Sequence, residues 1–192
     1  ILKGQKLYLN TLLNLLSDKM DNKESKIVEI QIGRNLRSDV SVSCKCHFNL
    51  PASIKVPPNL DDGTPFPTTY WLTCPMYNKK IGTLESHGMI NELDNELMKN
   101  PDLKKEWQSR QDSYKDERDT SQAPEAKYTS SGGVGGATES IKCLHSHTAD
   151  ELSTGLNPIG KIVLESVGYF NCEQPCIDIA EMKKNPEWKT IW

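Results

Sequence analysis

The sequence contains no long apolar run. Its 192 residues are 36% hydrophobic and 26% charged, and the mean hydropathy is -0.59. A membrane-spanning helix needs about 20 consecutive apolar residues, and no stretch of the chain approaches that length. We therefore expect a soluble protein without a transmembrane segment. Because the first residue is Ile1 rather than Met, the sequence leaves open where the natural N-terminus lies.

An excess of positive charge is also missing. The chain has 23 Lys and Arg residues against 26 Asp and Glu residues, which gives a net charge of -3. Proteins that bind the phosphate backbone of nucleic acids usually carry a basic excess. The composition therefore gives no overall signal for nucleic-acid binding.

Three standard catalytic motifs are absent as well. The glycine-rich residues 130–136 lack the Lys-Ser/Thr pair that completes a Walker-type phosphate loop. The sequence has no Gly-x-Ser-x-Gly elbow and no His-Glu-x-x-His zinc motif. Nothing local therefore identifies a P-loop enzyme, an α/β-hydrolase or a zincin protease.

Cysteine is comparatively abundant, with six residues in the chain. An even number can indicate disulfides in a secreted protein. A chain of 192 residues does not need such cross-links, and no signal peptide supports secretion. We expect reduced thiols, some of them bound to metal, and an intracellular location in the cytoplasm or an organelle.

Three short segments predict strands. Residues 40–46 alternate apolar or Cys side chains with polar ones, which is typical of a strand with one buried face. Residues 53–56 and 70–74 are also strand-like, and prolines follow both segments. We expect an α+β fold in which a small antiparallel sheet of about three strands packs against a mostly helical remainder.

The helical part has clear start signals. Apolar side chains at helical spacing mark residues 81–97, with Gly88 as an expected kink. Asn100 and Pro101 then provide an N-cap and a proline at the first helical position. A second, highly charged helix follows, so the two form a helical hairpin. A further helix is expected to begin near Glu139.

These elements divide the chain into three parts. Residues 28–177 are expected to form a single α+β domain, residues 178–192 a C-terminal tail, and residues 1–27 an N-terminal helical extension. Leucines at helical spacing give the extension an apolar face, which either packs against the domain or binds a protein partner. Residues 22–32 fit a helix that starts with a capping box, but they also alternate partly like a strand.

Several segments in a fixed order resemble one protein family. Two of them are especially specific: Leu72-Thr73-Cys74-Pro75, which ends residues 62–75, and Lys142-Cys143-Leu144-His145. The other matching segments are residues 31–34, 46–51, 84–86, 100–103, 135–136, 157–160 and 175–176. Over about residues 28–177 the sequence resembles the mainly bacterial family catalogued as domain of unknown function 501. The resemblance implies an α+β domain, favours a helix at residues 22–32, and implies no established activity.

The cysteines and histidines predict a metal site. Thiolate and imidazole groups suit Zn²⁺, so we predict that Cys46, Cys74, Cys143 and His145 form a tetrahedral zinc site. Their spacing is not that of a zinc finger, because they lie far apart in the chain. Regular helix geometry favours His147 as the partner of Cys143, whereas the family resemblance favours His145. His147 is therefore the alternative ligand.

A glycine-rich segment precedes Cys143 and is a candidate anion-binding loop. Its glycines are Gly132, Gly133, Gly135 and Gly136. Glycine lets a ligand approach the backbone closely, and free N–H groups at a helix start attract anions. The alternative is a flexible connector, which is a common role of such segments.

Three functions fit these features. The first is a metal-binding protein, structural or regulatory, with zinc as its ion. The second is a protein-interaction module that uses the Leu-rich N-terminal helix and the charged hairpin. The third is an enzyme in which Cys74 or Cys143 acts as a nucleophile beside a histidine, with an anion at the glycine loop. We favour the metal-binding function.

Overall fold

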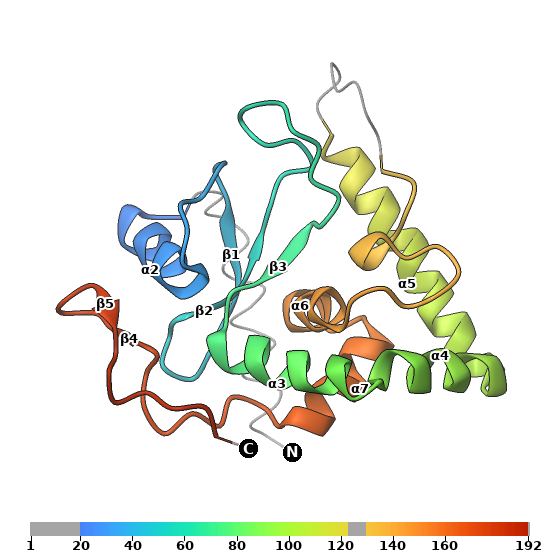
Figure 1. Cartoon of the computed structure of the whole chain (residues 1–192). Helices are drawn as coiled ribbons and strands as arrows, with labels where there is room; N and C mark the ends of the chain where they lie inside the picture. Colours follow the sequence, from blue (N-terminus) through green and yellow to red (C-terminus); the bar gives the residue numbers. More distant parts are fainter. Residues whose placement is uncertain (1–19, 123–129, 192) are drawn as a thin grey trace, which may run out of the picture.

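The computed structural model describes residues 20–122 and 130–191. Its central element is an antiparallel sheet in the order β1 (Ser41–Lys45), β2 (Pro51–Lys55) and β3 (Tyr70–Leu72) (Figure 1). Each strand lies within or overlaps a segment that the sequence predicts as a strand. The predicted α+β class and its small antiparallel sheet are therefore confirmed.

The helix α2 (Asn22–Ile32) precedes the sheet and has local signals at both ends. The side chain of Asp21 accepts a hydrogen bond from the Glu24 N–H at 2.7 Å. Gly33, with φ 72°, ends the helix in the left-handed conformation that glycine adopts easily. The helix favoured by the family resemblance is confirmed over the strand-like alternation.

Three helices follow the sheet: α3 (Pro75–Ser86), α4 (Met89–Lys99) and α5 (Pro101–Thr120). Gly88, with φ 93°, separates the first two, so the predicted kink is a complete break. Asn100 caps α5 with its side chain, as predicted. The two helices that Asn100 joins, α4 and α5, pack against each other.

The pair α6 (Leu144–Thr154) and α7 (Pro158–Val167) forms the centre of the helical part. The first of these begins later than the start predicted near Glu139. Residues 139–143 are irregular, and Cys143 has an extended backbone directly before the helix. The Ile141 N–H in this segment donates a hydrogen bond to the Asp94 carboxylate at 2.9 Å, which fixes the segment against α4.

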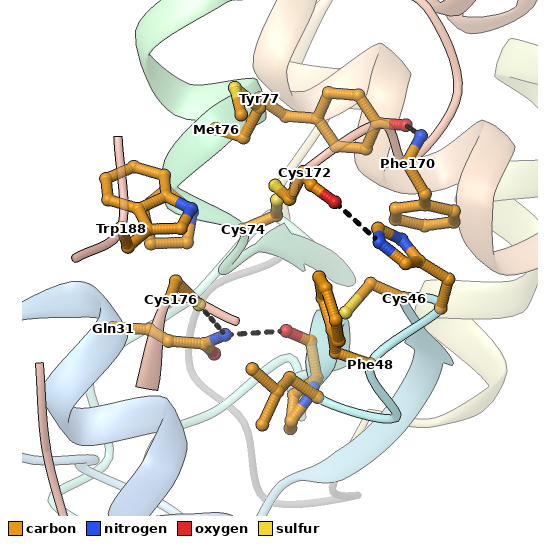
Figure 2. A pocket seen from close by; sticks show the side chains of 14 residues that line it. Gln31, Cys46, Phe48, Cys74, Met76, Tyr77, Phe170, Cys172, Cys176 and Trp188 are labelled. Atoms are coloured by element: carbon orange, nitrogen blue, oxygen red, sulfur yellow. Dashed lines mark hydrogen bonds between the residues drawn. The ribbon is translucent and has the colours of Figure 1, made fainter. Parts of the chain in front are cut away.

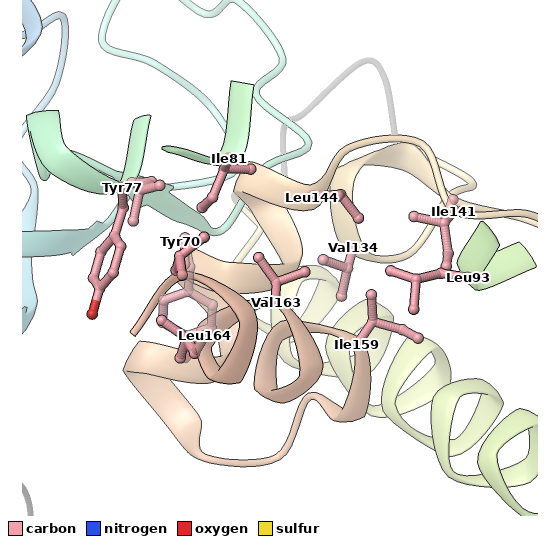
Figure 3. Close-up of a cluster of buried hydrophobic side chains, with 14 of the residues drawn as sticks. Tyr70, Tyr77, Ile81, Leu93, Val134, Ile141, Leu144, Ile159, Val163 and Leu164 are labelled. Atoms are coloured by element: carbon pink, nitrogen blue, oxygen red, sulfur yellow. The ribbon is translucent and has the colours of Figure 1, made fainter. Parts of the chain in front are cut away.

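The main hydrophobic core surrounds α6 and α7 (Figure 3). Its members include Tyr70, Tyr77, Ile81, Leu93, Val134, Ile141, Leu144, Ile159, Val163 and Leu164. One face of the sheet joins this core through Leu72, and the hydroxyl of Ser53 lies 3.0 Å from that of Ser153 in α6. The other face packs against α2, where Ile54 meets Val28. The sheet therefore lies between α2 and α6 (Figure 1).

The C-terminal segment adds a second sheet that the sequence did not predict. It consists of β4 (Ile177–Asp178) and β5 (Lys183–Lys184), and both strands lie against α2. Ile177 packs with Ile27 and Leu50 in a small separate cluster. The described part of the tail thus folds back over the domain.

The Leu-rich residues 2–19 fall outside the described residues. The predicted helix there, and its proposed role in binding a protein partner, stay predictions. Within the described ranges, no helix is long and apolar enough to cross a membrane.

Candidate functional site

A thiol, an imidazole and a carboxylate meet where α3 ends and α6 begins. Cys143 is the residue before α6, His145 lies in the first turn of that helix, and Glu85 is near the last residue of α3. One ligand atom from each side chain lies within 4.8 Å of the other two. In residues 20–122 and 130–191, no other group of three or more Cys, His, Asp or Glu residues converges this closely.

The two ring nitrogens of His145 have different partners. Nε2 lies 3.1 Å from the carbonyl oxygen of Asn78, and Nδ1 lies 3.3 Å from a carboxylate oxygen of Glu85. Because a carbonyl oxygen only accepts, Nε2 carries a hydrogen. Metal-binding histidines usually donate their second N–H to a carbonyl or carboxylate, which fixes the ring. The contact with Asn78 thus fixes the ring and leaves Nδ1 as the nitrogen that faces Glu85.

A backbone group fixes the carboxylate of Glu85. The Leu144 N–H donates a hydrogen bond to Glu85 Oε1 at 2.7 Å. This N–H is one of those at the start of α6 that have no partner within the helix. The side chains of Glu85 and His145 are 25% and 26% exposed, so the site is in contact with solvent.

The protonation states of Cys143 and His145 are coupled. Burial raises the pKa of the Cys143 thiol, but hydrogen bonds from His145 and the Ser146 N–H outweigh it and lower the pKa. Burial lowers the pKa of His145, while hydrogen bonds with Cys143 and the Asn78 carbonyl raise it to about 9. The environment therefore favours a thiolate at Cys143 beside a protonated His145. A thiolate is the form that binds metals, whereas the imidazole would have to release a proton to bind one.

The glycine-rich segment lies beside this group and contains the short helix η2 (Val134–Gly136). A Cβ atom at Gly135 would lie 3.2 Å from the Cβ of Ser146 and 3.4 Å from that of Cys143. Gly135 also has φ 62°, which side-chain-bearing residues rarely adopt. Glycine therefore allows the loop to approach Cys143.

Two N–H groups of the predicted anion loop donate hydrogen bonds to carbonyl oxygens of the same segment. Gly133 donates to the Ala137 carbonyl at 2.7 Å, and Gly136 donates to the Gly133 carbonyl at 3.0 Å. Gly132 and Gly133 are buried. Since α6 begins at Leu144, the glycines do not lead directly into a helix. Anion binding at this loop stays a prediction.

The predicted zinc ligands lie in two separate places. Cys143 and His145 meet at Glu85, whereas Cys46 and Cys74 line a cavity at the other end of α3. Cys74 precedes the first residue of α3, so roughly 16 Å of helix separates it from Glu85. The structure thus does not gather the four predicted residues into one group.

The alternative ligand His147 is completely buried, and its Nδ1 lies 3.1 Å from Oδ1 of Asn157. The four-residue spacing does not pair it with Cys143, because Cys143 has extended backbone before the helix. Glu85 was not predicted as a ligand, although it lies in residues 84–86, one of the segments that carry the family resemblance. Its place in that segment was the sequence signal that could have identified Glu85.

Comparison with known proteins agrees with the resemblance. The family model described as "Protein of unknown function (DUF501)" matches residues 42–165. No curated protein and no solved structure matches the chain significantly.

Proposed function

The chain belongs to the DUF501 family, and we propose that it is a zinc-binding protein whose ion is held by Glu85, Cys143 and His145. The convergence of their ligand atoms within 4.8 Å carries this proposal. Two of the ligands are fixed by backbone partners, His145 by the Asn78 carbonyl and Glu85 by the Leu144 N–H. Such support is typical of metal ligands.

The chemistry of the three side chains favours zinc over hard cations. Mg²⁺ and Ca²⁺ take oxygen ligands, whereas thiolate and imidazole suit Zn²⁺. Cys143 supplies sulfur, His145 supplies nitrogen, and Glu85 supplies a single oxygen. Sets of this kind occur in tetrahedral zinc sites.

Three protein ligands leave one position of a tetrahedron open. In zinc proteins a closed set of four ligands is structural, while an open position holds water or a substrate. The partial exposure of Glu85 and His145 gives small molecules access to that position. We infer that the ion binds an exchangeable ligand.

Zinc titration of the purified chain against a chromophoric chelator tests this proposal. Loss of a partner that only orients a ligand weakens metal binding about 10- to 100-fold. Loss of a ligand in Cys143→Ser or His145→Gln should therefore weaken binding of this ion by at least about 100-fold. His87→Gln, at an exposed histidine just beyond α3, is the matched control and should keep the wild-type affinity.

Equal zinc affinity in His145→Gln and His87→Gln would reject the proposal. The proposal is also rejected if Cys143→Ser binds as much zinc as the wild-type chain. Elemental analysis of the variants provides the zinc content independently of the titration.

The geometry also favours a second function, in which Cys143 is a nucleophile. His145 contacts the Cys143 thiol, and Glu85 in turn contacts His145. A cysteine beside a histidine that a third group orients is typical of activated nucleophiles. Alkylation by iodoacetamide separates the two functions. Zinc should protect Cys143 from alkylation if it is a ligand, whereas a free nucleophile reacts at the same rate with or without zinc.

A further inference from the structure

Four of the six cysteines surround one small cavity, which Figure 2 shows. They are Cys46, Cys74, Cys172 and Cys176. The cavity has a volume of about 20 Å³, which is room for one group the size of a water molecule or an ion. The remaining lining is mostly apolar and includes Phe48, Met76, Phe170 and Trp188.

Cys46 opens the turn that joins β1 to β2. The Asn49 N–H donates to the Cys46 carbonyl at 2.8 Å, and the Cys46 N–H donates to the Leu50 carbonyl at 2.9 Å. Burial raises the pKa of the Cys46 thiol, while the N–H groups of Leu50 and Phe48 act against that rise. The turn therefore directs backbone donors toward the sulfur, and such donors favour a thiolate.

Cys74 stands at the N-terminus of α3. Burial raises the pKa of its thiol to about 12, while the N–H groups of Tyr77 and Met76 act in the opposite direction. The N-terminus of a helix also favours negative charge. A second sulfur thus lies in a place that suits a thiolate once a cation offsets the burial.

Cys172 and Cys176 bring the C-terminal segment to the same cavity. The Cys172 carbonyl lies 2.9 Å from Nε2 of His47, and Nε2 of Gln31 donates a weak hydrogen bond to Cys176 Sγ at 3.5 Å. Gln31 is buried in α2. Segments that are far apart in the sequence therefore bring their cysteines to one cavity (Figure 2).

Two polar atoms of residues that line the cavity have no hydrogen-bond partner in the described part of the chain. They are Oε1 of Gln31 and Nε1 of Trp188. Leaving buried polar groups unpaired is unfavourable. A thiolate would accept a hydrogen bond from the indole N–H of Trp188, whereas the Gln31 oxygen can itself only accept. The indole N–H is therefore the polar group here that suits a thiolate.

We propose that Cys46, Cys74, Cys172 and Cys176 bind a second zinc ion as a closed tetrathiolate site. A tetrahedron of four thiolates suits zinc or an iron–sulfur cluster, and a cavity with room for one ion fits zinc. All four residues are described, and no three of their sulfurs lie within 4.8 Å of one another. Tetrahedral Zn–S bonds require the sulfurs to lie about 3.8 Å apart, so zinc binding includes a movement of these cysteine side chains toward one another.

The role of this ion is structural and separate from the proposed function. A closed set of four protein ligands leaves no position for an exchangeable ligand. After α7, the regular structure in the described C-terminal segment consists only of β4 and β5, with two residues each. The ion would therefore fix this segment to the β1–β2 turn and to α3.

X-ray absorption and zinc content test the proposal. In Cys143→Ser, which lacks a ligand of the first site, zinc absorption should show four sulfur neighbours at about 2.3 Å. Cys172→Ser and Cys176→Ser should each hold one zinc per chain fewer than Cys44→Ser. Cys44 is the matched control, because it is a half-buried thiol on β1 that does not line the cavity.

Several results would overturn the proposal. They are nitrogen or oxygen neighbours around zinc in Cys143→Ser, iron in place of zinc, disulfides among these cysteines in anaerobically purified protein, and equal zinc content in Cys172→Ser and Cys44→Ser. If Cys172→Ser does not fold, the absorption measurement on Cys143→Ser decides alone. If the first site is wrong, Cys143→Ser keeps the zinc content of the wild type, and the zinc held by Cys46, Cys74, Cys172 and Cys176 is unaffected. Failure of one proposal can therefore be told from failure of the other.

Discussion

The guanidinium group of Arg110 holds the carboxylate of Asp150 with two nitrogens, Nε at 2.8 Å and Nη2 at 2.6 Å. Both side chains are buried, with 4% and 0% exposed. Asp150 also accepts a hydrogen bond from Nδ2 of Asn157 at 2.7 Å. The ion pair therefore joins α5 to α6 and to the residue that caps α7.

Asp150→Asn should strongly destabilise the fold. It leaves the charge of Arg110 buried, and Glu117, at 3.4 Å, cannot replace two short hydrogen bonds. Removing one partner of a buried ion pair costs about 3–5 kcal/mol, which urea unfolding would measure. Asp112→Asn removes an ion pair with Lys115 at a carboxylate that is 76% exposed, so a change below about 0.5 kcal/mol is expected. Similar losses in the two variants would contradict the assigned role of the pair.

Tyr114→Phe should also destabilise the fold, but less. The Tyr114 hydroxyl accepts a hydrogen bond from the Thr69 N–H at 2.6 Å, and both residues are buried. Without the hydroxyl, a buried N–H loses its partner, which costs about 1–3 kcal/mol. Tyr169→Phe, at an exposed tyrosine, should leave the free energy of unfolding nearly unchanged. Equal unfolding midpoints for wild type and Tyr114→Phe would show that another acceptor replaces the hydroxyl.

Two glycine substitutions in helices should have opposite effects. A Cβ atom at Gly160 in α7 would lie 2.1 Å from the His147 carbonyl oxygen, so Gly160→Ala forces α6 and α7 apart. The expected loss is about 1–3 kcal/mol. At Gly82 in α3 a Cβ atom meets nothing within 4 Å, so Gly82→Ala should stabilise by about 0.5–1 kcal/mol. Thermal unfolding measures both, and a stabilised Gly160→Ala variant would contradict the close approach of the two helices.

The sequence predicted the parts of the fold that depend on local signals. Alternation over β1 and the cap at Asn100 both act within a few residues, and both predictions are confirmed. The start of α6 was predicted too early, since residues 139–143 are irregular and contact Asp94, which is distant in the chain. Contacts between residues so far apart leave no local pattern.

The candidate site was predictable only in part, for the same reason. Cys143 and His145 are neighbours in the chain, and the family resemblance identified both. Glu85 joins them through the packing of α3 against α6, which no spacing in the sequence indicates. Cys46 and Cys74 were assigned to this site by ligand type alone, and ligand type does not say which end of α3 a cysteine occupies.

His147 combines complete burial with a single hydrogen bond from its ring. Nδ1 donates to Oδ1 of Asn157 at 3.1 Å, because the Asn157 amide nitrogen already donates to Asp150. Nε2 has no partner within residues 20–122 and 130–191. Burial lowers the pKa of His147 to about 4, although the hydrogen bond to Asn157 and the charges of Asp150 and Asp94 act in the opposite direction.

This pKa makes stability fall in mild acid. In the unfolded chain the pKa of a histidine is about 6.5, so between about pH 6.5 and pH 4 the unfolded chain binds a proton that the folded chain does not. The free energy of unfolding should therefore drop through this window as pH falls, by up to roughly 3 kcal/mol from His147. His147→Asn keeps a donor near Asn157 but cannot take up a proton. Its stability in urea, measured with a chelator present, should depend less on pH even though it starts lower. His87→Asn, at an exposed histidine, should keep the wild-type dependence, and parallel curves for wild type and His147→Asn would assign the effect to another group.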